Sequence, residues 1–259
     1  MKAVILAGGF GTRISEESSV KPKPMVEIGG KPIIWHIMKT YSHYGIKDFV
    51  ICCGYKSHVL KEYFSNFSLY NNDVTFDFRE DKTVFHNNNT EDWRVTLVET
   101  GLKTMTGGRL LKVKKYIDED HFCFTYGDGL SDHNIKDSID FHIDNKKLAT
   151  VLAANLPGRF GALELNGNSV QSFTEKPKSE GSLINAGYFV LNKEIFKYIK
   201  DDETIWEKEP LQNLARDGEL MAYNHNGFWK PMDTINDRNI LESLWANDLA
   251  PWKVWKQID

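Results

Sequence analysis

The sequence predicts an α/β protein with a Rossmann-like, doubly wound sheet that is mixed but mostly parallel and carries helices on both faces. Apolar runs, typical of strands buried on both sides, alternate with helical patterns through the first two thirds of the 259 residues. Three of these runs end beside glycines, at Leu6, Gly54 and Gly127. Because such sheets bind ligands at the carboxyl ends of their strands, these three ends mark the predicted site.

The elements of the first half follow from these patterns. Residues 3–6 form an apolar strand that runs into a glycine-rich turn. Residues 32–41 have the apolar spacing of a helix, with a proline at the favoured first position. The other elements expected in this half are a strand over 49–55, a helix over 58–67, an alternating strand over 74–78, an irregular excursion over 79–93 and a helix over 96–105.

The second half begins with a third core strand over 122–126. A helix over 135–144 and a strand over 149–154 follow, and then a hairpin with Gly167-Asn168 at its tip. No internal repeat, linker or low-complexity tract divides the chain, so we expect one domain with insertions. Three tryptophans in the tail are expected to dock on a helix or to contact another subunit, namely Trp245, Trp252 and Trp255.

Charge and cysteine content narrow the class of protein. A formal net charge of −4 provides no general basic field, which argues against nucleic acid as the main partner. Two of the three cysteines are the adjacent pair Cys52-Cys53 in an apolar run, which indicates buried thiols in a reducing compartment. The chain shows neither a secretory signal pattern nor 18 successive apolar residues. We therefore expect a cytoplasmic protein without membrane insertion.

The glycine-rich turn after the first strand is suited to bind an anion. Gly8, Gly9 and Gly11 let backbone N–H groups approach phosphate oxygens, and Arg13 adds a charged donor. Glycines used only for turn geometry are the alternative. The turn is not a P-loop, because no Gly-Lys-Ser/Thr follows it, and its spacing differs from the G-x-G-x-x-G of dinucleotide-binding proteins. An NAD-dependent enzyme is therefore disfavoured.

A lysine-proline run follows about ten residues later. Residues 21–24 read Lys-Pro-Lys-Pro, so this backbone is extended and stiff. Such a segment can aim Lys23 at a fixed point, whereas an isolated run of this kind is usually a solvated loop.

Taken together, residues 6–13, the Pro22-Lys23 pair and Gly30-Lys31-Pro32 resemble the signature of the sugar-nucleotide pyrophosphorylases, which join a nucleoside triphosphate to a sugar 1-phosphate. The resemblance implies the nucleotide-diphospho-sugar transferase type of fold over residues 1–259. It also implies a nucleotide-binding half over about 1–130, a sugar-phosphate-binding half over about 131–235 and a helical tail over 236–259.

Two acids are candidates for holding a metal. Asp128 lies on a turn at a strand end between two glycines, and Asp233 follows an apolar approach stiffened by Pro231. Carboxylates near a triphosphate provide the hard oxygen ligands that Mg²⁺ prefers. Spacing does not show that Asp128 and Asp233 meet, and a turn-capping Asp is the alternative for Asp128. The resemblance implies that both chelate the catalytic Mg²⁺.

The resemblance also assigns a sugar-phosphate side. Glu175 can accept hydrogen bonds from sugar hydroxyls, Lys176 offers a compact charge for a phosphate, and Asn185 presents an amide. An exposed turn is the alternative for the Glu-Lys pair. The family contacts imply Gly161, Glu175, Lys176, Asn185 and Gly187 as the sugar-phosphate site.

Within the family the chain is most similar to the cytidylyltransferases, so the implied substrates are CTP and glucose 1-phosphate. A Thr-Gly-Gly-Arg turn within 104–109 replaces the segment that holds the base in thymidylyl and uridylyl relatives. An ordinary connecting loop is the alternative reading of that turn. The nucleotide-binding residues implied are Leu6, Ala7, Gly8, Gly9, Phe10, Gly11, Thr12, Arg13, Lys23, Thr104, Gly108, Arg109 and Gly127.

The resemblance implies catalysis by positioning and charge neutralisation, with Arg13, Lys23 and Asp128 as the catalytic residues. It also implies a homo-oligomer, with a hexamer favoured, and a route to the deoxysugars of a bacterial O-antigen. The alternatives are a uridylyl-, thymidylyl- or guanylyltransferase on this scaffold and an inactive nucleotide-sensing homologue. The insertion over 66–95 has no assigned role beyond assembly or lid contacts.

Overall fold

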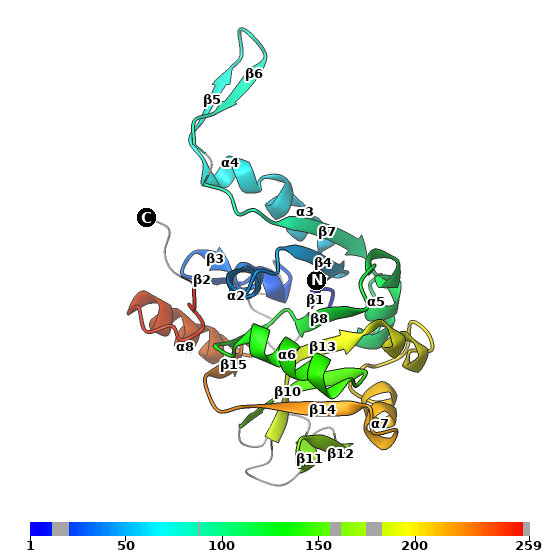
Figure 1. The fold of residues 1–259 in the computed structure, drawn as a ribbon. Coiled ribbons are helices and arrows are strands. Elements are labelled where there is room, and N and C mark those ends of the chain that lie inside the picture. The colour runs from blue at the N-terminus through cyan, green and yellow to red at the C-terminus, as the bar shows by residue number, and fades with distance from the viewer. Residues whose placement is uncertain (12–20, 88, 156–161, 175–182, 256–259) are drawn as a thin grey trace.

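The fold is built on one large sheet (Figure 1). The computed structural model describes residues 1–11, 21–87, 89–155, 162–174 and 183–255. Within these ranges nine strands form the sheet, in the order β10-β14-β12-β11-β13-β8-β1-β4-β7. They are β1 (Lys2–Leu6), β4 (Asp48–Cys53), β7 (Arg94–Glu99), β8 (His121–Tyr126), β10 (Ala149–Asn155), β11 (Ala162–Asn166), β12 (Ser169–Thr174), β13 (Leu183–Asn192) and β14 (Leu220–His225).

The strand directions confirm the predicted mixed sheet. β8, β1, β4 and β7 are parallel neighbours, while β13 runs antiparallel to both β8 and β10. β10 and β14 are parallel to each other. The hairpin of β11 and β12, with Gly167 at its tip, is antiparallel as expected.

Helices cover both faces of the sheet. Side chains alternate between the two faces along each strand, so an apolar strand places apolar side chains on both faces. Ile5 faces the layer that contains α2, α3, α6 and α8, whereas its neighbour Val4 faces α5 and α7. The helices are α2 (Ile33–His43), α3 (Ser57–Ser65), α4 (Phe67–Asn71), α5 (Thr106–Lys112), α6 (Ile135–Asn145), α7 (Glu209–Arg216) and α8 (Ile235–Ala246), with short 3₁₀ turns η2 (Lys23–Met25), η3 (Lys114–Tyr116) and η4 (Lys193–Tyr198).

Several sequence expectations were wrong. The backbone at Lys23, expected to be extended, forms the 3₁₀ turn η2, and the Thr-Gly-Gly-Arg segment expected as a turn is the first part of helix α5. The helix expected over 96–105 is absent from the described structure, where β7 occupies Arg94–Glu99 and pairs with β4. Val95, Thr96 and Val98 are β-branched and favour an extended backbone over a helix. The excursion over 79–93 contains strand β6 (Lys82–Phe85), which pairs with β5 (Val74–Asp77).

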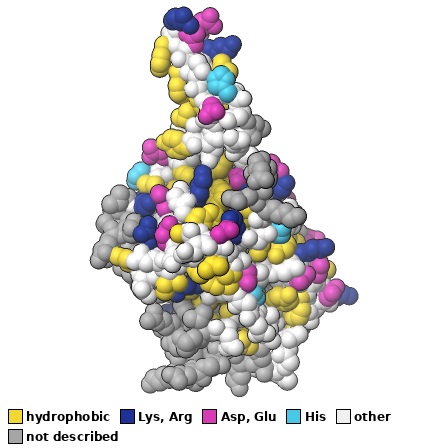
Figure 2. Space-filling model, turned by 90° about the vertical axis from the view of Figure 1, so that its left-hand side faces the viewer, with side chains coloured by type: hydrophobic (Ala, Val, Ile, Leu, Met, Phe, Trp, Pro, Cys, Tyr) yellow, Lys and Arg dark blue, Asp and Glu magenta, His cyan; other side chains and the backbone are white. Residues whose placement is uncertain are grey.

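The β5–β6 hairpin forms an arm that projects from the body of the molecule (Figure 1). Its aromatic side chains are exposed: 92% of Phe78, 50% of Phe76 and 48% of Phe85. Figure 2 shows hydrophobic side chains along this arm at the top of the view. No helix among the described residues combines the length and apolarity required to cross a bilayer.

The tail tryptophans dock on α2, as one of the two expectations stated. Trp252 is fully buried and its indole N–H donates to Nδ1 of His36 at 3.4 Å. Trp245 stacks edge-on against the same imidazole, with ring centroids 4.7 Å apart. These contacts hold the end of α8 and the segment that follows it against α2.

Two small ribbons complete the fold and position the site. β2 (Glu27–Ile28) pairs with β3 (Lys31–Pro32), and β9 (Gly129–Ser131) pairs with β15 (Trp229–Pro231). The second ribbon follows Asp128 directly and ends shortly before Asp233. It therefore brings together two segments that are about a hundred residues apart in the sequence.

Candidate active site

A cavity of about 450 Å³ opens where β1 and β8 end. This volume lies in the range of ordinary ligand sites. Its position at the carboxyl edge of the parallel strands is the predicted one. The residues of the sequence-based site that line it are Leu6, Ala7, Gly8, Gly9, Phe10, Gly11, Lys23, Thr104, Arg109, Gly127, Asp128 and Asp233. Gly54, the expected site residue at the end of β4, packs against Gly8 and Arg109 and is not among the residues that line the cavity.

The glycine-rich turn is tied to the end of β4. The N–H of Ala7 donates to the carbonyl of Cys52 at 3.0 Å, and the N–H of Tyr55 donates to the carbonyl of Gly8 at 3.1 Å. Gly11 has φ of 65°, in the left-handed region that favours glycine. Gly127 lies so close to the carbonyl of Leu6 that a Cβ would collide with it. Contacts with the end of β4 and with Gly127 therefore fix the backbone of the turn at the edge of the cavity.

Lys23 and the two acids meet in this cavity. Nζ of Lys23 lies 2.5 Å from Oδ2 of Asp128 and 2.7 Å from Oδ1 of Asp233. Burial alone would lower the pKa of Lys23, but the charges of Asp128 and Asp233 outweigh it and raise the pKa above its ordinary value. The raised pKa keeps the ammonium charged. Because the side chain of Lys23 is only 12% exposed, the ammonium is also largely shielded from water.

The backbone explains why these three side chains converge. Pro22 and Pro24 stiffen the segment around Lys23, which forms the 3₁₀ turn η2 with the N–H of Met25 donating to the carbonyl of Pro22. The N–H of Met232 donates to the carbonyl of Asp128 at 2.7 Å. This bond extends the β9–β15 ribbon and sets the two acids side by side.

The acid pair fits a magnesium ion. Both carboxylates accept a hydrogen bond from one cation, the Lys23 ammonium, so their oxygens converge on a single position. Over the described ranges no group of three or more His, Cys, Asp or Glu side chains is arranged to hold a metal. A magnesium ion at Asp128 and Asp233 would therefore take its other ligands from water and from a bound phosphate, which is its usual behaviour.

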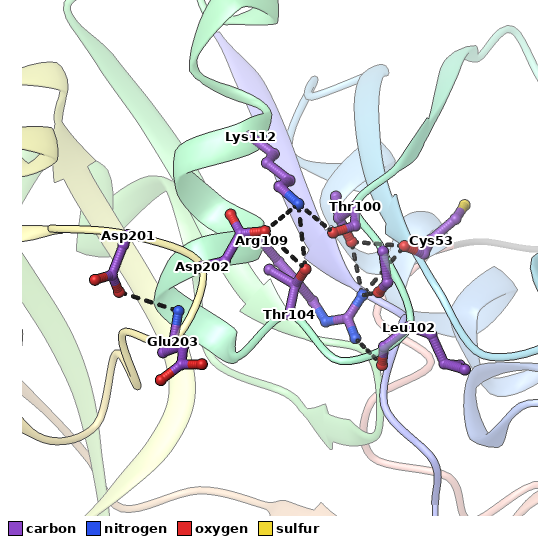
Figure 3. A network of polar contacts seen from close by, with 10 residues as sticks. Cys53, Thr100, Leu102, Thr104, Arg109, Lys112, Asp201, Asp202 and Glu203 are labelled. Atoms are coloured by element: carbon purple, nitrogen blue, oxygen red, sulfur yellow. Dashed lines mark hydrogen bonds and ion pairs between the residues drawn. The ribbon is translucent and has the colours of Figure 1, made fainter.

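Arg109 is a buried organiser of the cavity wall (Figure 3). Its guanidinium donates to the carbonyls of Gly101 at 2.7 Å and Leu102 at 3.3 Å and to the hydroxyl of Thr100 at 2.7 Å. These bonds direct the guanidinium of Arg109 toward the protein interior, where it holds the loop before α5 in place. Lys112 supports the same loop through the carbonyl of Thr100 and the hydroxyl of Thr104 (Figure 3).

Gly108 serves packing. A Cβ at this position would lie 2.6 Å from the Cα and the carbonyl oxygen of Asp202, so the glycine lets α5 approach the segment before α7. Thr104 does line the cavity and also approaches Asp202, at 3.4 Å.

On the sugar side the structure describes only part of the predicted set. Asn185 and Gly187 lie on β13 behind Tyr126. The amide of Asn185 donates to the Tyr126 hydroxyl at 3.3 Å, and the ring of Tyr126 packs on Gly187, which has φ of 76°. The remaining predicted residues, Thr12, Arg13, Gly161, Glu175 and Lys176, lie outside the described residues.

Tyr126 and Glu207 are among the cavity-lining residues that sequence reasoning missed. Tyr126 lines the cavity and is supported by Asn185 and Gly187. Glu207 accepts a hydrogen bond from the hydroxyl of Thr106 at 2.6 Å. Tyr126 stands at a predicted strand end and could have been found there. Glu207 lies in a loop about a hundred residues away from Thr106, and nothing in its neighbouring sequence marks it.

A glycine-rich turn and two carboxylates that meet at one cavity are the features expected of a nucleotide-binding transferase, in which charge on phosphoryl oxygens must be neutralised. The comparison with known families makes this specific. The chain belongs to the nucleotidyl transferase family, whose model matches residues 2–237.

Individual relatives agree with this assignment. The chain is 58% identical to glucose-1-phosphate cytidylyltransferase of Salmonella typhimurium, over 99% of this chain and 100% of that protein. It is 43% identical to a probable glucose-1-phosphate cytidylyltransferase of Bacillus subtilis, over 98% and 100%. Among solved structures, HddC from Yersinia pseudotuberculosis superposes with a TM-score of 0.74 at 22% identity, over 94% of this chain and 99% of HddC, which shows a shared fold.

Proposed function

We propose that this protein transfers CMP from CTP to glucose 1-phosphate and releases pyrophosphate, forming CDP-glucose. The observation that carries the proposal is the full-length match, at 58% identity, to a relative of that activity. An oxygen of the sugar phosphate attacks the α-phosphorus of CTP in line, and the bond to the β-phosphate breaks. The attacking phosphate is already ionised, so the reaction needs neither a general base nor a covalent enzyme intermediate.

The nucleotide half of the site receives the triphosphate. The backbone of residues 6–11 cradles it, Thr12 and Arg13 would also bind it, and Arg13 favours the leaving pyrophosphate. Lys23 neutralises charge at the α-phosphate, the position where negative charge is concentrated during transfer. Gly127 would contact the nucleotide at the end of β8, where it lines the cavity and packs closely against Leu6. Arg109 and Gly108 would affect binding of the base indirectly. Arg109 holds the loop that carries Thr104, and Gly108 lets α5 pack closely behind that loop.

Asp128 and Asp233 would hold Mg²⁺, which when bound neutralises charge on the phosphate oxygens. Their convergence on one ammonium supports this role. Glu175, Lys176 and Gly161 would bind the hexose and its phosphate. Asn185 and Gly187 would position Tyr126 on this side of the cavity.

The domain and assembly proposals rest on the same family relationship. Residues 1–130 would bind the nucleotide, 131–235 the sugar phosphate, and the tail would dock as a helical extension. We infer a homo-oligomer, with a hexamer favoured, and the exposed phenylalanines of the β5–β6 arm support contact between copies. The three buried free thiols fit a reducing compartment such as the cytoplasm, and the product would supply deoxysugars of an O-antigen.

A pyrophosphate-release panel tests the proposed reaction. Purified protein is incubated with glucose 1-phosphate, MgCl₂ and one of CTP, UTP, dTTP or GTP. We expect rapid release with CTP and, from the Asp233→Asn variant, a rate lower by about 10²–10³-fold, since charge stabilisation is lost. Turnover with UTP or dTTP and none with CTP would reject the cytidylyl assignment, and an unaffected Asp233→Asn variant would reject the metal assignment.

A further inference from the structure

We propose that the Lys23 ammonium occupies the magnesium position in the nucleotide-free enzyme, so that the metal binds only when Lys23 leaves the two carboxylates. The proposal rests on the proposed function through the metal role of Asp128 and Asp233. It adds an order of events: the nucleotide gives Lys23 a new partner, and the metal then enters between the acids.

The geometry shows why one position cannot hold both cations. Nζ of Lys23 is 2.5 Å from one carboxylate oxygen and 2.7 Å from the other. These two oxygens are therefore no more than about 5 Å apart. Oxygens around an octahedral magnesium are separated by about 3 Å when adjacent and about 4 Å when opposite, given bond lengths near 2.1 Å. The acids thus frame a nearly formed cation site with the ammonium at its centre.

The electrostatics oppose the entry of a metal alone. Lys23 and Asp233 are only 12% and 13% exposed, so their attraction is weakly screened by water. A metal that displaced the ammonium would gain two protein carboxylates, while the ammonium would lose both of its partners. Since the described residues hold no third carboxylate or imidazole grouped with this pair, the exchange needs another source of negative charge. The triphosphate supplies oxygens for the metal and for the ammonium.

The lysine can make this exchange without a change in fold. Its backbone is fixed in η2, where the N–H of Val26 donates to the carbonyl of Lys23 at 3.1 Å and prolines lie on either side. Only the four-carbon side chain has to rotate, and lysine side chains are flexible. Asp128 is the more exposed acid, at 30%, so the site is open to the cavity on that side.

Binding of Mn²⁺ to the nucleotide-free protein tests the proposal. Mn²⁺ prefers the same oxygen ligands, and the free ion is quantified by its electron paramagnetic resonance signal. We expect weak binding to the wild type and a dissociation constant at least about tenfold lower for Lys23→Met, because the ammonium then no longer occupies the position between the two acids. The double variant Lys23→Met/Asp233→Asn should lose this gain. Lys21→Met is the matched control, since Lys21 pairs with Glu27 instead.

A Lys23→Met variant that binds Mn²⁺ no more tightly than the wild type would overturn the proposal. If that variant does not fold, reductive methylation of the wild type, read by mass spectrometry, gives the answer. Saturating Mn²⁺ together with a non-hydrolysable CTP analogue should expel Lys23 from the acid pair and change its methylation relative to Lys21, and an unchanged ratio would reject the exchange.

The same titration separates this proposal from the proposed function. One outcome rejects the exchange and leaves the metal site intact. In it, Mn²⁺ binds when CTP is present, but without CTP it binds to Lys23→Met no more tightly than to the wild type. Mn²⁺ that binds to neither protein, even with CTP, rejects the metal role of Asp128 and Asp233 itself.

Discussion

The backbone of Gly8 lies directly against the guanidinium of Arg109. A Cβ at Gly8 would overlap Nη1 and Cζ of that side chain. Gly54 contacts the same guanidinium in the same way. The glycine-rich turn is therefore a packing surface for a buried arginine, and the first glycine of the turn, Gly8, is required for that contact.

The Gly8→Ala variant tests this contact. The added methyl group has to displace a guanidinium that is engaged in several hydrogen bonds, so we expect a loss of about 1–3 kcal/mol in the free energy of unfolding. Urea denaturation measures the loss. Gly9→Ala is the control, because nothing lies within 4 Å of a Cβ at Gly9. Equal free energies of unfolding for the two variants would show that the side chain of Arg109 can move away from the added methyl group without loss of stability.

Arg109→Met tests whether Arg109 is primarily an organiser of the wall. Removing the guanidinium leaves the carbonyls of Gly101 and Leu102 without this donor, so we expect about 2–4 kcal/mol of destabilisation together with a raised KM for CTP. Lys112→Met provides the comparison and should cost under about 1 kcal/mol, since Lys112 is 36% exposed. A raised KM with unchanged unfolding free energy would instead indicate a direct contact between Arg109 and the nucleotide.

The β5–β6 arm offers a test of assembly. Phe76 and Phe78 stack with ring centroids 6.3 Å apart on a two-stranded hairpin, which is marginal on its own in water. Replacing both by Ser should reduce the molecular mass measured by light scattering after gel filtration. Lys82→Ser changes a charged residue on the same arm and should keep the wild-type mass. A double variant of unchanged mass would remove the arm from the assembly interface.

Acid should loosen the tail through His36. Burial lowers the pKa of His36 to about 4, although its bond to the carbonyl of Ile28 opposes the shift. The N–H of Trp252 faces Nδ1, so the neutral imidazole accepts there and donates to Ile28 through Nε2. Because the unfolded chain takes up this proton near pH 6.5, the contribution of His36 is complete above that pH and is lost as the pH falls toward 4.

Unfolding in urea between pH 7 and pH 4 measures this effect. The wild type should lose stability over that interval, with roughly 3 kcal/mol attributable to His36 at the acid end. His36→Gln keeps a donor and an acceptor but does not titrate, so its profile should be flatter. His43→Gln, a change at an exposed histidine of the same helix, should follow the wild type. Parallel profiles for all three proteins would exclude His36 as the source.

Much of the fold could be predicted from local patterns. The runs that became β1, β4 and β8 are apolar enough to be buried on both faces. The ends of β1 and β8 marked the cavity, whereas Gly54 at the end of β4 packs against Gly8 and Arg109 instead of lining it. β7 was missed because a short run of mixed polarity fits a strand and a helix equally well until its pairing with β4 is known.

The site could be predicted only in part. Lys23 stood out through its prolines, but its convergence with Asp128 and Asp233 came from the family resemblance, since the β9–β15 ribbon that joins them is a long-range pairing. The inward direction of Arg109 was also not predictable, because it depends on carbonyls at the end of β4 and in the loop after β7.

A competition assay tests the central claim most directly. The protein is given CTP, UTP, dTTP and GTP together at equal concentration, with glucose 1-phosphate and MgCl₂, and the products are resolved by mass spectrometry. We predict CDP-glucose as the dominant sugar nucleotide, formed with an equal amount of pyrophosphate. A mixture dominated by UDP-glucose, dTDP-glucose or GDP-glucose would contradict the account.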